Sequence, residues 1–276
     1  MGITTTTPSS VPSYFLQRLT SPGLIGLIIE TAGNHAVTMW GRTETGFASA
    51  VEMGSLILVM TRLSVRMDPS HTPRWGDTLE VATYFRVRGK AGAVREWIVT
   101  DVTTKRVVAT ATSSWVMVDL ETRRLARIPA AMLDAYNPYS PAAEVSLPEL
   151  PVLATPAVPA VVEPRAAATV DHSLRRADVD MNAHVTTGTY VAWITSLPWQ
   201  DLVAPEGSLE VTQVDVEFKN ECRGTEGVVR VVAAVEEEEE GGTGGGVVFS
   251  LKQPDEKVEE GGKAVEYARA RISYTK

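Results

Sequence analysis

The sequence predicts an α+β protein built as a degenerate twofold repeat, with one helix followed by several strands in each copy. An apolar stripe of helical spacing, followed by strand-like segments, runs through residues 23–120 and recurs through residues 184–274. The stretch between the copies, residues 138–164, contains seven prolines. Because proline cannot donate to a sheet ladder and favours extended chain, we predict a linker between two domains.

The first copy predicts a helix from Gly23 to Trp40, with Pro22 near its start. The apolar residues that form its stripe are Leu24, Ile25, Leu27, Ile28, Ala32, Val37 and Met39. Alternating or continuous apolar residues then predict several long strands. These strands cover residues 55–67, 78–88, 94–102 and 107–120.

The second copy predicts the same order of elements, a helix and then strands. The helix covers residues 184–197, and the strands cover residues 209–218, 228–235, 247–251 and 265–274. The run 236–246, five glutamates and then mostly glycine, predicts a disordered loop between strands. The predicted domains are therefore 23–137 and 169–276, joined by a linker over 138–168.

The first 22 residues lie outside both predicted domains and have an unusual composition. Residues 1–29 contain no Asp or Glu, one Arg, and many Ser and Thr. This bias is typical of an organelle transit peptide, although the segment is short for one. We interpret residues 1–22 as a disordered tail or the remnant of a transit segment.

Composition excludes several classes of protein. The 276 residues, 44% of them hydrophobic, can bury a substantial core. No stretch approaches the roughly 20 apolar residues that span a bilayer, so no membrane span is expected. A single cysteine, Cys222, excludes an internal disulfide, and the four histidines are scattered. We therefore expect neither a metal nor another cofactor.

The net charge of -8 is concentrated in one segment. Residues 236–260 hold nine acidic side chains and two lysines, so this segment contributes -7 and the rest of the chain is nearly neutral. A nucleic-acid-binding protein usually has a strongly basic balance and recognisable motifs, and neither is found. A local basic patch remains available for an acidic protein partner.

A compact group of polar residues precedes the second predicted helix. Asp178, Asp180, Asn182 and His184 can take a proton, orient a water molecule and polarise a carbonyl group, close to free helical amides. The simpler interpretation is helix capping, because Asp and Asn are favoured ahead of a first turn. Capping alone leaves His184 unexplained.

These residues form part of an ordered series of motifs. The series begins with Asn34-His35, Gly46-Phe47, Glu52-Met53, Thr61-Arg62, Trp75-Gly76-Asp77, Arg95-Glu96-Trp97, Asp101 and Ser114-Trp115-Val116-Met117. It continues with Thr122-Arg123-Arg124-Leu125, Ile128-Pro129, Asp178-Val179-Asp180-Met181-Asn182-Ala183-His184-Val185, Glu217-Phe218-Lys219-Asn220-Glu221-Cys222 and, weakly, Glu266-Tyr267-Ala268-Arg269. In this order the chain resembles the plant-type acyl-acyl carrier protein (acyl-ACP) thioesterases, as a divergent or algal member.

The resemblance implies a tandem hotdog fold, in which each half is a long helix wrapped by an antiparallel sheet. It implies hydrolysis of fatty acyl-ACP to a free fatty acid in plastid fatty acid synthesis. The first half then provides the acyl-chain pocket and the second half the catalytic residues. A hotdog acyl-CoA thioesterase and a non-catalytic fatty-acyl binding protein remain alternatives, because fold does not settle function.

Site residues follow from the resemblance, position by position. Asp180, Asn182 and His184 correspond to the catalytic Asp, Asn and His, and Glu221 corresponds to a second carboxylate. We expect Glu221 to be the general base with His184 beside it, Asn182 to hold the carbonyl or the water, and Asp180 to fix Asn182 or the water. The backbone amides of Val185 and Thr186 are expected to form the oxyanion site.

Two further assignments remain open. Cys222 beside Glu221 also fits a Cys-His nucleophile, although a buried inert thiol is equally ordinary. His35 on the first helix is interpreted as a structural histidine at the domain interface.

The implied partner, acyl carrier protein, is acidic. Its dock is expected among Arg123, Arg124, Arg127, Arg175 and Arg176, although each of these arginines also fits an ordinary solubilising surface. A homodimer is left open.

Overall fold

The computed structural model describes residues 19–40, 53–140, 168–180, 183–203, 209–224, 227–236, 244–255, 258 and 262–275. Asn182, the first 18 residues, residues 141–167 of the predicted linker and residues 237–243 of the predicted acidic loop lie outside this part of the chain.

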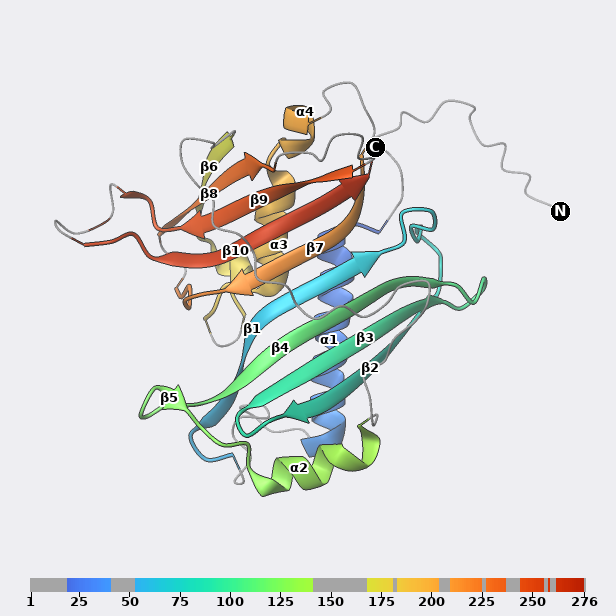
Figure 1. Ribbon diagram of the computed structural model, residues 1–276, viewed down its shortest axis with the longest axis vertical. Coiled ribbons are helices and arrows are strands. Elements are labelled where there is room, and N and C mark those ends of the chain that lie inside the picture. Colours follow the sequence, from blue (N-terminus) through green and yellow to red (C-terminus); the bar gives the residue numbers. More distant parts are fainter. Residues whose placement is uncertain are drawn as a thin grey trace.

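One antiparallel sheet runs through both halves of the described chain (Figure 1). Its strand order is β2-β3-β4-β1-β7-β10-β9-β8-β6, with β5 paired to β4 alone. The strands of the first half are β1 (Leu56–Met67), β2 (Leu79–Arg88), β3 (Gly92–Asp101), β4 (Val107–Asp119) and β5 (Arg124–Leu125). Those of the second half are β6 (Ala168–Ser173), β7 (Glu210–Phe218), β8 (Val228–Val235), β9 (Gly244–Lys252) and β10 (Glu266–Thr275).

The strand order confirms the twofold repeat. The path β1-β4-β3-β2 in the first half corresponds to the path β7-β10-β9-β8 in the second half. Strands β1 and β7 pair antiparallel at the centre, with Ser64 opposite Asp215, and so join the two halves into one sheet. Strand β6 has no counterpart in the described first half, where the corresponding segment would precede α1.

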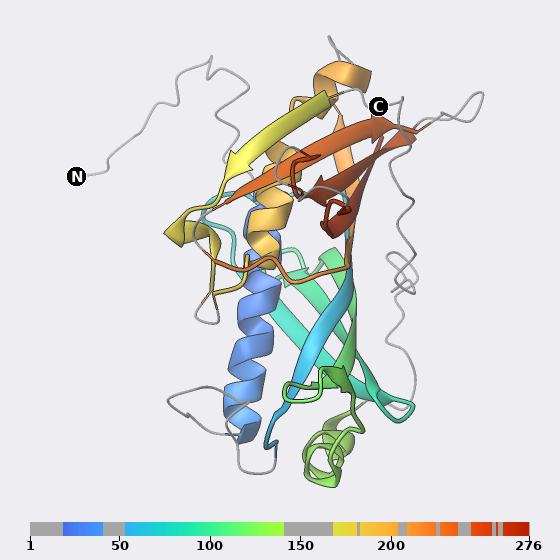
Figure 2. The ribbon, with the colours of Figure 1, turned by 90° about the vertical axis from the view of Figure 1, so that its left-hand side faces the viewer.

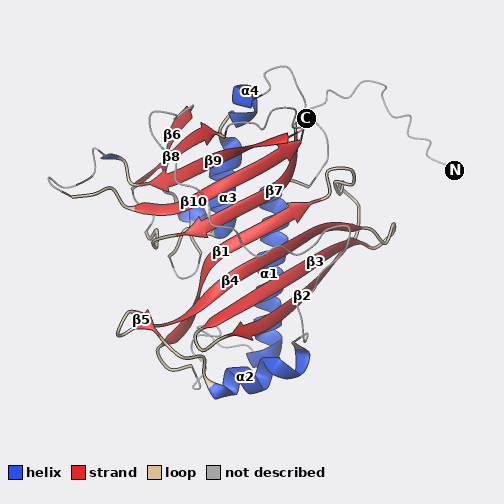
Figure 3. Cartoon of the chain, in the orientation of Figure 1, coloured by secondary structure: helices blue, strands red, loops and turns tan. Residues whose placement is uncertain are grey.

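Two helices lie on the same face of this sheet, one for each half (Figure 2). Helix α1 covers Ser21–Trp40 and helix α3 covers Thr187–Ser196, and the two helices contact each other. The second helix is therefore half the length of the first, which differs from the expectation of a long helix in each half. Two shorter helices, α2 (Ala130–Tyr136) and α4 (Trp199–Val203), complete the helical part (Figure 3).

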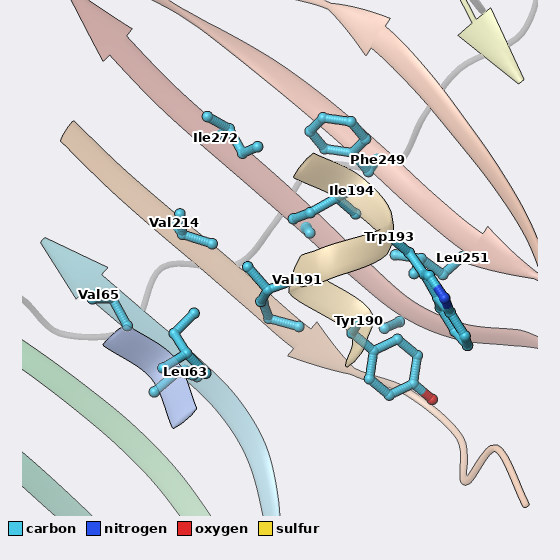
Figure 4. Packing of buried hydrophobic residues seen from close by; sticks show 14 of the residues in the cluster. Leu63, Val65, Tyr190, Val191, Trp193, Ile194, Val214, Phe249, Leu251 and Ile272 are labelled. Carbon is cyan, nitrogen blue, oxygen red and sulfur yellow. The ribbon is translucent and has the colours of Figure 1, made fainter. Parts of the chain in front are cut away.

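The main hydrophobic core fills the space between the helices and the sheet. Val191 and Ile194 of α3 are fully buried and face Val214 of β7 and Ile272 of β10 (Figure 4). Ile28 of α1 belongs to the same cluster, so the core is continuous between the halves. Burying each such side chain contributes about 1.5–3 kcal/mol to folding.

A second, smaller core lies in the first half. Its members are Met53, Phe85, Ala93, Met117, Ile128, Met132 and Tyr136. Helix α2 contributes two of them, Met132 and Tyr136, and closes this end of the sheet (Figure 1). We call this group the first-half cluster.

Several predicted bounds require correction. The second helix begins at Thr187 instead of residue 184, because residues 183–186 pair with residues 178–180. Strand β9 begins at Gly244, so the glycines at the end of the predicted disordered loop belong to the sheet. At the other end of that loop, Glu236 is ordered by an ion pair with Arg271 at 2.7 Å.

Six short elements were not predicted: β5, β6, α2, α4 and the two 3-10 helices Asn137–Tyr139 and Arg176–Asp178. Each has 2 to 7 residues, too few for a period of 2.0 or 3.6 to emerge. The start of β6 at Ala168 also places the end of the predicted linker within a strand.

Candidate functional site

Just before α3, residues 178–180 pair with residues 183–186, and we call this pairing the hairpin. The Asp180 amide donates to the His184 carbonyl at 2.9 Å, and the Thr186 amide donates to the Asp178 carbonyl at 3.0 Å. Ala183 near the tip has φ 58°, a left-handed conformation that a non-glycine residue rarely adopts. Such local strain often accompanies functional sites, and here it directs the chain into His184.

The segment after β7 lies against this hairpin. His184 forms an antiparallel bridge with Arg223, the Val185 amide donates to the Cys222 carbonyl at 3.0 Å, and the Gly224 amide donates to the Ala183 carbonyl at 3.1 Å. Residues separated by almost 40 positions in sequence therefore become neighbours. The structure brings the backbones of His184 and of the residues next to Glu221 together.

His184 carries an unsatisfied polar atom. Its Nε2 atom is buried and has no hydrogen-bond partner in the described part of the chain. An unpaired buried polar group costs about 1–3 kcal/mol, and in a native structure it needs an explanation such as a functional role. The Asp180 side chain orients this residue, because its Oδ1 atom accepts the His184 amide at 3.1 Å.

Helix capping does not explain the acidic run. The cap of α3 is Thr186, whose Oγ1 atom accepts the Thr189 amide at 3.0 Å. Asp178 instead stabilises the start of the short 3-10 helix Arg176–Asp178, because its Oδ2 atom accepts the amide of the cap residue Arg175 at 2.7 Å. Asp180 therefore does not serve as the cap of α3.

The expected oxyanion donors are wrong. The Val185 and Thr186 amides are already hydrogen-bonded to the Cys222 and Asp178 carbonyls, so neither can bind an oxyanion. The next two amides, those of Thr187 and Gly188 in the first turn of α3, have no partner among the described residues. The free donors therefore lie two residues further along the chain than predicted.

Glu221 is held by two arginines. Its Oε2 atom lies 3.1 Å from Arg123 Nη2 and 2.8 Å from Arg223 Nη2. Partial burial by itself raises the pKa of this carboxyl, but hydrogen bonds and charge from the two guanidinium groups outweigh it, and the net pKa is lowered. Glu221 is therefore ionised at neutral pH.

Cys222 has the surroundings of an inert thiol. Its side chain is buried and accepts a hydrogen bond from the Tyr190 hydroxyl. Burial raises the pKa of the Cys222 thiol to about 11, although the Tyr190 hydrogen bond opposes this. Burial, followed by the neighbouring Cys222, also raises the pKa of Tyr190. A neutral thiol is a poor nucleophile, so these surroundings disfavour the Cys-His alternative.

A cleft of about 460 Å³ opens beside this site. Its lining residues are Leu174, Cys222, Arg223, Gly227, Val228, Gln253 and Tyr267. Two of them belong to the segment that pairs with the hairpin. The cleft therefore lies next to the segment that carries Glu221, although Glu221 and His184 are not among its lining residues.

The first half contains a histidine with different surroundings. His35 Nδ1 lies 2.9 Å from Arg95 Nη1, and the imidazole packs edge-on against Tyr136. Burial, and then the charge of Arg95, lowers the pKa of His35. The contacts of His35 lie within the first half, so the expected position at the domain interface is wrong.

The five arginines expected to dock a carrier protein differ in their surroundings. Arg123 is engaged with Glu221, and Arg175 Nε lies 3.6 Å from Asp178 Oδ2. Arg124, Arg127 and Arg176 are exposed and have no carboxylate partner among the described residues.

Neither a metal-ion cluster nor a membrane-spanning helix is found in the described part of the chain. No cluster of three or more His, Cys, Asp or Glu side chains suits a metal ion. None of the described helices is long and apolar enough to cross a membrane.

Sequence reasoning did not identify several residues of the site. Arg223 and Tyr190 were overlooked because neither belongs to a motif that distinguishes it from an ordinary surface or core residue. The amides of Val185 and Thr186 were predicted as oxyanion donors in place of those of Thr187 and Gly188, because the predicted start of the helix was three residues too early.

Comparison with known proteins identifies both halves. Residues 12–136 match the acyl-ACP thioesterase N-terminal domain, and residues 163–270 match the C-terminal domain. The chain is 35% identical over 214 residues to the chloroplastic palmitoyl-acyl carrier protein thioesterase of Arabidopsis thaliana, which covers 75% of this chain and 48% of that protein. It is 28% identical over 202 residues to the chloroplastic oleoyl-acyl carrier protein thioesterase of Coriandrum sativum, which covers 72% of this chain and 53% of that protein.

Solved structures share the fold. The 12:0-ACP thioesterase from Umbellularia californica superimposes with a TM-score of 0.74 at 24% identity, over 96% of this chain and 94% of that one. An acyl-ACP thioesterase from Bacteroides thetaiotaomicron gives a TM-score of 0.68 at 18% identity, over 94% and 91% of the two chains. Both likenesses support the double hotdog architecture.

The chain spans about half the length of the curated relatives it matches. Within that span, both halves are covered in order by the two domains of one family. The chain therefore belongs to the acyl-ACP thioesterase family.

Proposed function

We propose that this protein hydrolyses the thioester of fatty acyl-ACP, which releases a free fatty acid and ends chain elongation. The observation that carries the proposal is the hairpin that presents the unpaired Nε2 atom of His184 beside the Glu221–Gly224 segment and its cleft. Membership of the family supplies the substrate class.

In the proposed reaction, water attacks the thioester carbonyl carbon. Glu221, ionised at neutral pH, takes the proton of that water, and His184 Nε2 hydrogen-bonds the water or the thioester. The carbonyl oxygen becomes an oxyanion, which the Thr187 and Gly188 amides stabilise at the positive end of α3.

The intermediate then collapses, the carbon–sulfur bond breaks, and the pantetheine sulfur leaves as a thiolate. Little acid assistance is needed, because thiols ionise near pKa 8.5. Asn182, outside the described residues, keeps its proposed role of holding the carbonyl or the water. Asp180 supports the site through the backbone of His184.

The acyl chain is proposed to enter the first half. The first-half cluster supports this proposal, since three of its members are methionines, Met53, Met117 and Met132. Methionine side chains are unbranched and adapt their shape to irregular apolar partners. Which chain length fits is a question for the substrate panel below.

Docking of the acidic carrier protein is proposed to use Arg124, Arg127 and Arg176. Each is exposed and lies near the site, two on the segment that follows Arg123 and one on the 3-10 helix before the hairpin. Charge reversal of these residues should raise the Michaelis constant and leave turnover unchanged, and the effect should weaken as salt is added.

The chloroplastic relatives support a plastid location for this protein. Import of the chain, fused to a fluorescent protein, into isolated chloroplasts tests that part of the proposal.

The deciding experiment compares matched panels of acyl-ACPs and acyl-CoAs with the purified chain. Turnover that prefers carrier protein supports the proposal and reports the chain length. A preference for CoA identifies an acyl-CoA thioesterase instead. Tight binding of acyl-ACP by a folded chain without any turnover identifies a fatty-acyl binding protein.

A further inference from the structure

One side chain of the first half reaches into the catalytic part of the second half. Arg123, which follows β4, forms a hydrogen bond with Glu221, which follows β7 in the other copy of the repeat. This contact links the two halves at the site itself. It joins residues that are 98 positions apart.

The turn that carries Arg123 is firmly built. The Asp119 side chain accepts the amides of Glu121 and Thr122 at 3.0 and 2.8 Å, and the Arg123 amide donates to the Asp119 carbonyl at 2.8 Å. Arg123 itself has φ 58°, in the left-handed region. The backbone therefore fixes the point from which the guanidinium group extends.

An almost identical turn occurs after β3 and does not reach a carboxylate. The Asp101 side chain accepts the amides of Thr103 and Thr104, the Lys105 amide donates to the Asp101 carbonyl at 2.8 Å, and Lys105 has φ 59°. Lys105 is exposed and has no carboxylate partner among the described residues. The chain thus contains a natural control for the turn of Arg123.

The two arginines at Glu221 bind the same oxygen atom. Arg123 and Arg223 both contact Oε2, and the other oxygen, Oε1, has no partner among the described residues. The carboxylate is thereby anchored through Oε2, and among the described residues Oε1 remains the oxygen that can accept a proton from a positioned water. Arg223 is in turn tied to His184 through the backbone bridge.

We propose that Arg123 is a positioning residue, which extends from the first half to anchor Glu221 Oε2 and so points Oε1 at the reacting water. The proposal rests on the proposed function, in which Glu221 is the base. It reassigns Arg123 from docking the carrier protein to completing the active site. The second half then has a fully oriented base only when the turn of the first half is in place.

The charged groups around Glu221 give the sign of the pH effect. The two guanidinium groups, Arg123 on the turn and Arg223 on its own segment, both stabilise the ionised carboxylate and lower its pKa. Removing Arg123 removes part of that stabilisation, so Glu221 becomes protonated at higher pH. The acidic limb of the turnover profile should therefore move to higher pH.

The test compares Arg123→Gln, Arg123→Lys and the matched control Lys105→Gln in the full chain, with acyl-ACP as substrate. Arg123→Gln should lower kcat about tenfold through loss of orientation, with little change in KM, and should shift the acidic limb upward. Arg123→Lys should restore most of the turnover, and Lys105→Gln should behave as wild type. An Arg123→Gln variant that keeps its turnover and its pH profile, or that raises only KM, overturns the proposal.

A double-mutant cycle separates this proposal from the proposed function. The unfolding free energies of Arg123→Gln, Glu221→Gln and the double variant should show a favourable coupling between the two side chains. No coupling means that Arg123 does not anchor Glu221. If the cycle shows the coupling but the wild-type chain turns over no acyl-ACP, the proposed function is refuted. The catalytic purpose of the contact is then refuted with it.

Discussion

The two halves of the molecule hold a histidine in contrasting states. In the first half, His35 is hydrogen-bonded to Arg95 and packed against Tyr136. In the second half, His184 follows a left-handed residue and keeps a buried Nε2 atom without a partner in the described chain. The two copies thus hold these two histidines differently, which agrees with the proposed place of the chemistry in the second half.

Replacing each histidine in turn is the strongest test of this contrast. His184→Ala should lower kcat by about three orders of magnitude, because it removes a group placed at the reacting atoms. His35→Ala should keep most of the activity, since its contacts are structural. Steady-state hydrolysis of acyl-ACP measures both, and equal losses in the two variants would remove the functional distinction between the halves.

The core provides a second comparison, because the halves differ in chemistry but share one cluster of buried side chains. Ile28 in α1 and Ile194 in α3 are both fully buried in it. Either Ile→Ala change should cost about 2–5 kcal/mol of unfolding free energy. Both variants should unfold in a single transition, because β1 and β7 join the halves into one sheet.

Calorimetry and urea titration followed by fluorescence provide the measurement. Two separate transitions, with only one displaced in each variant, would show that the halves unfold independently.

The start of α3 offers a smaller but more local test. Thr186→Ala removes the cap that accepts the Thr189 amide and should cost about 1 kcal/mol of stability. It should also lower kcat severalfold, since the proposed oxyanion amides, Thr187 and Gly188, lie in the same turn. Thr186→Ser keeps the hydroxyl group and is the matched control. If the Thr186→Ala variant is destabilised but keeps its turnover, the amides at the start of α3 do not contribute to catalysis.

The sequence allowed the long elements to be predicted well, and the short ones poorly. Strand β8 was predicted with its observed bounds, Val228–Val235, because its eight residues form a run that is apolar apart from Arg230 and rich in valine. The last three residues of the hairpin, 184–186, were read as part of the helix, because the shape of the hairpin depends on bonds to Cys222 and Gly224. Contacts with a segment almost 40 residues away leave no local pattern.

The same reasoning explains the outcome at the site. The chemical types of Asp180, His184 and Glu221 stand out in the sequence, whereas the atoms that orient them do not. Arg123 looks like any surface arginine until the fold brings the turn of the first half to Glu221. The oxyanion donors were predicted wrongly for a related reason. The amides of Val185 and Thr186 are already used in hydrogen bonds to the Cys222 and Asp178 carbonyls, and these bonds cannot be seen in the sequence.

The smallest expected effect concerns Cys222. This residue lies in the second half, but its side chain is buried and, like that of His35 in the first half, is hydrogen-bonded. Cys222→Ala should retain most of the turnover. The thiol of the native chain should resist alkylation at neutral pH and should react only as the pH approaches its pKa of about 11, since the neutral form persists below that value. The alkylation rate measured against pH checks this, with the urea-unfolded chain as the control that reacts near pH 8.5. A fast reaction of the native thiol at neutral pH, together with a loss of activity in Cys222→Ala, would show that Cys222 is a reactive thiolate. That result would restore the Cys-His mechanism.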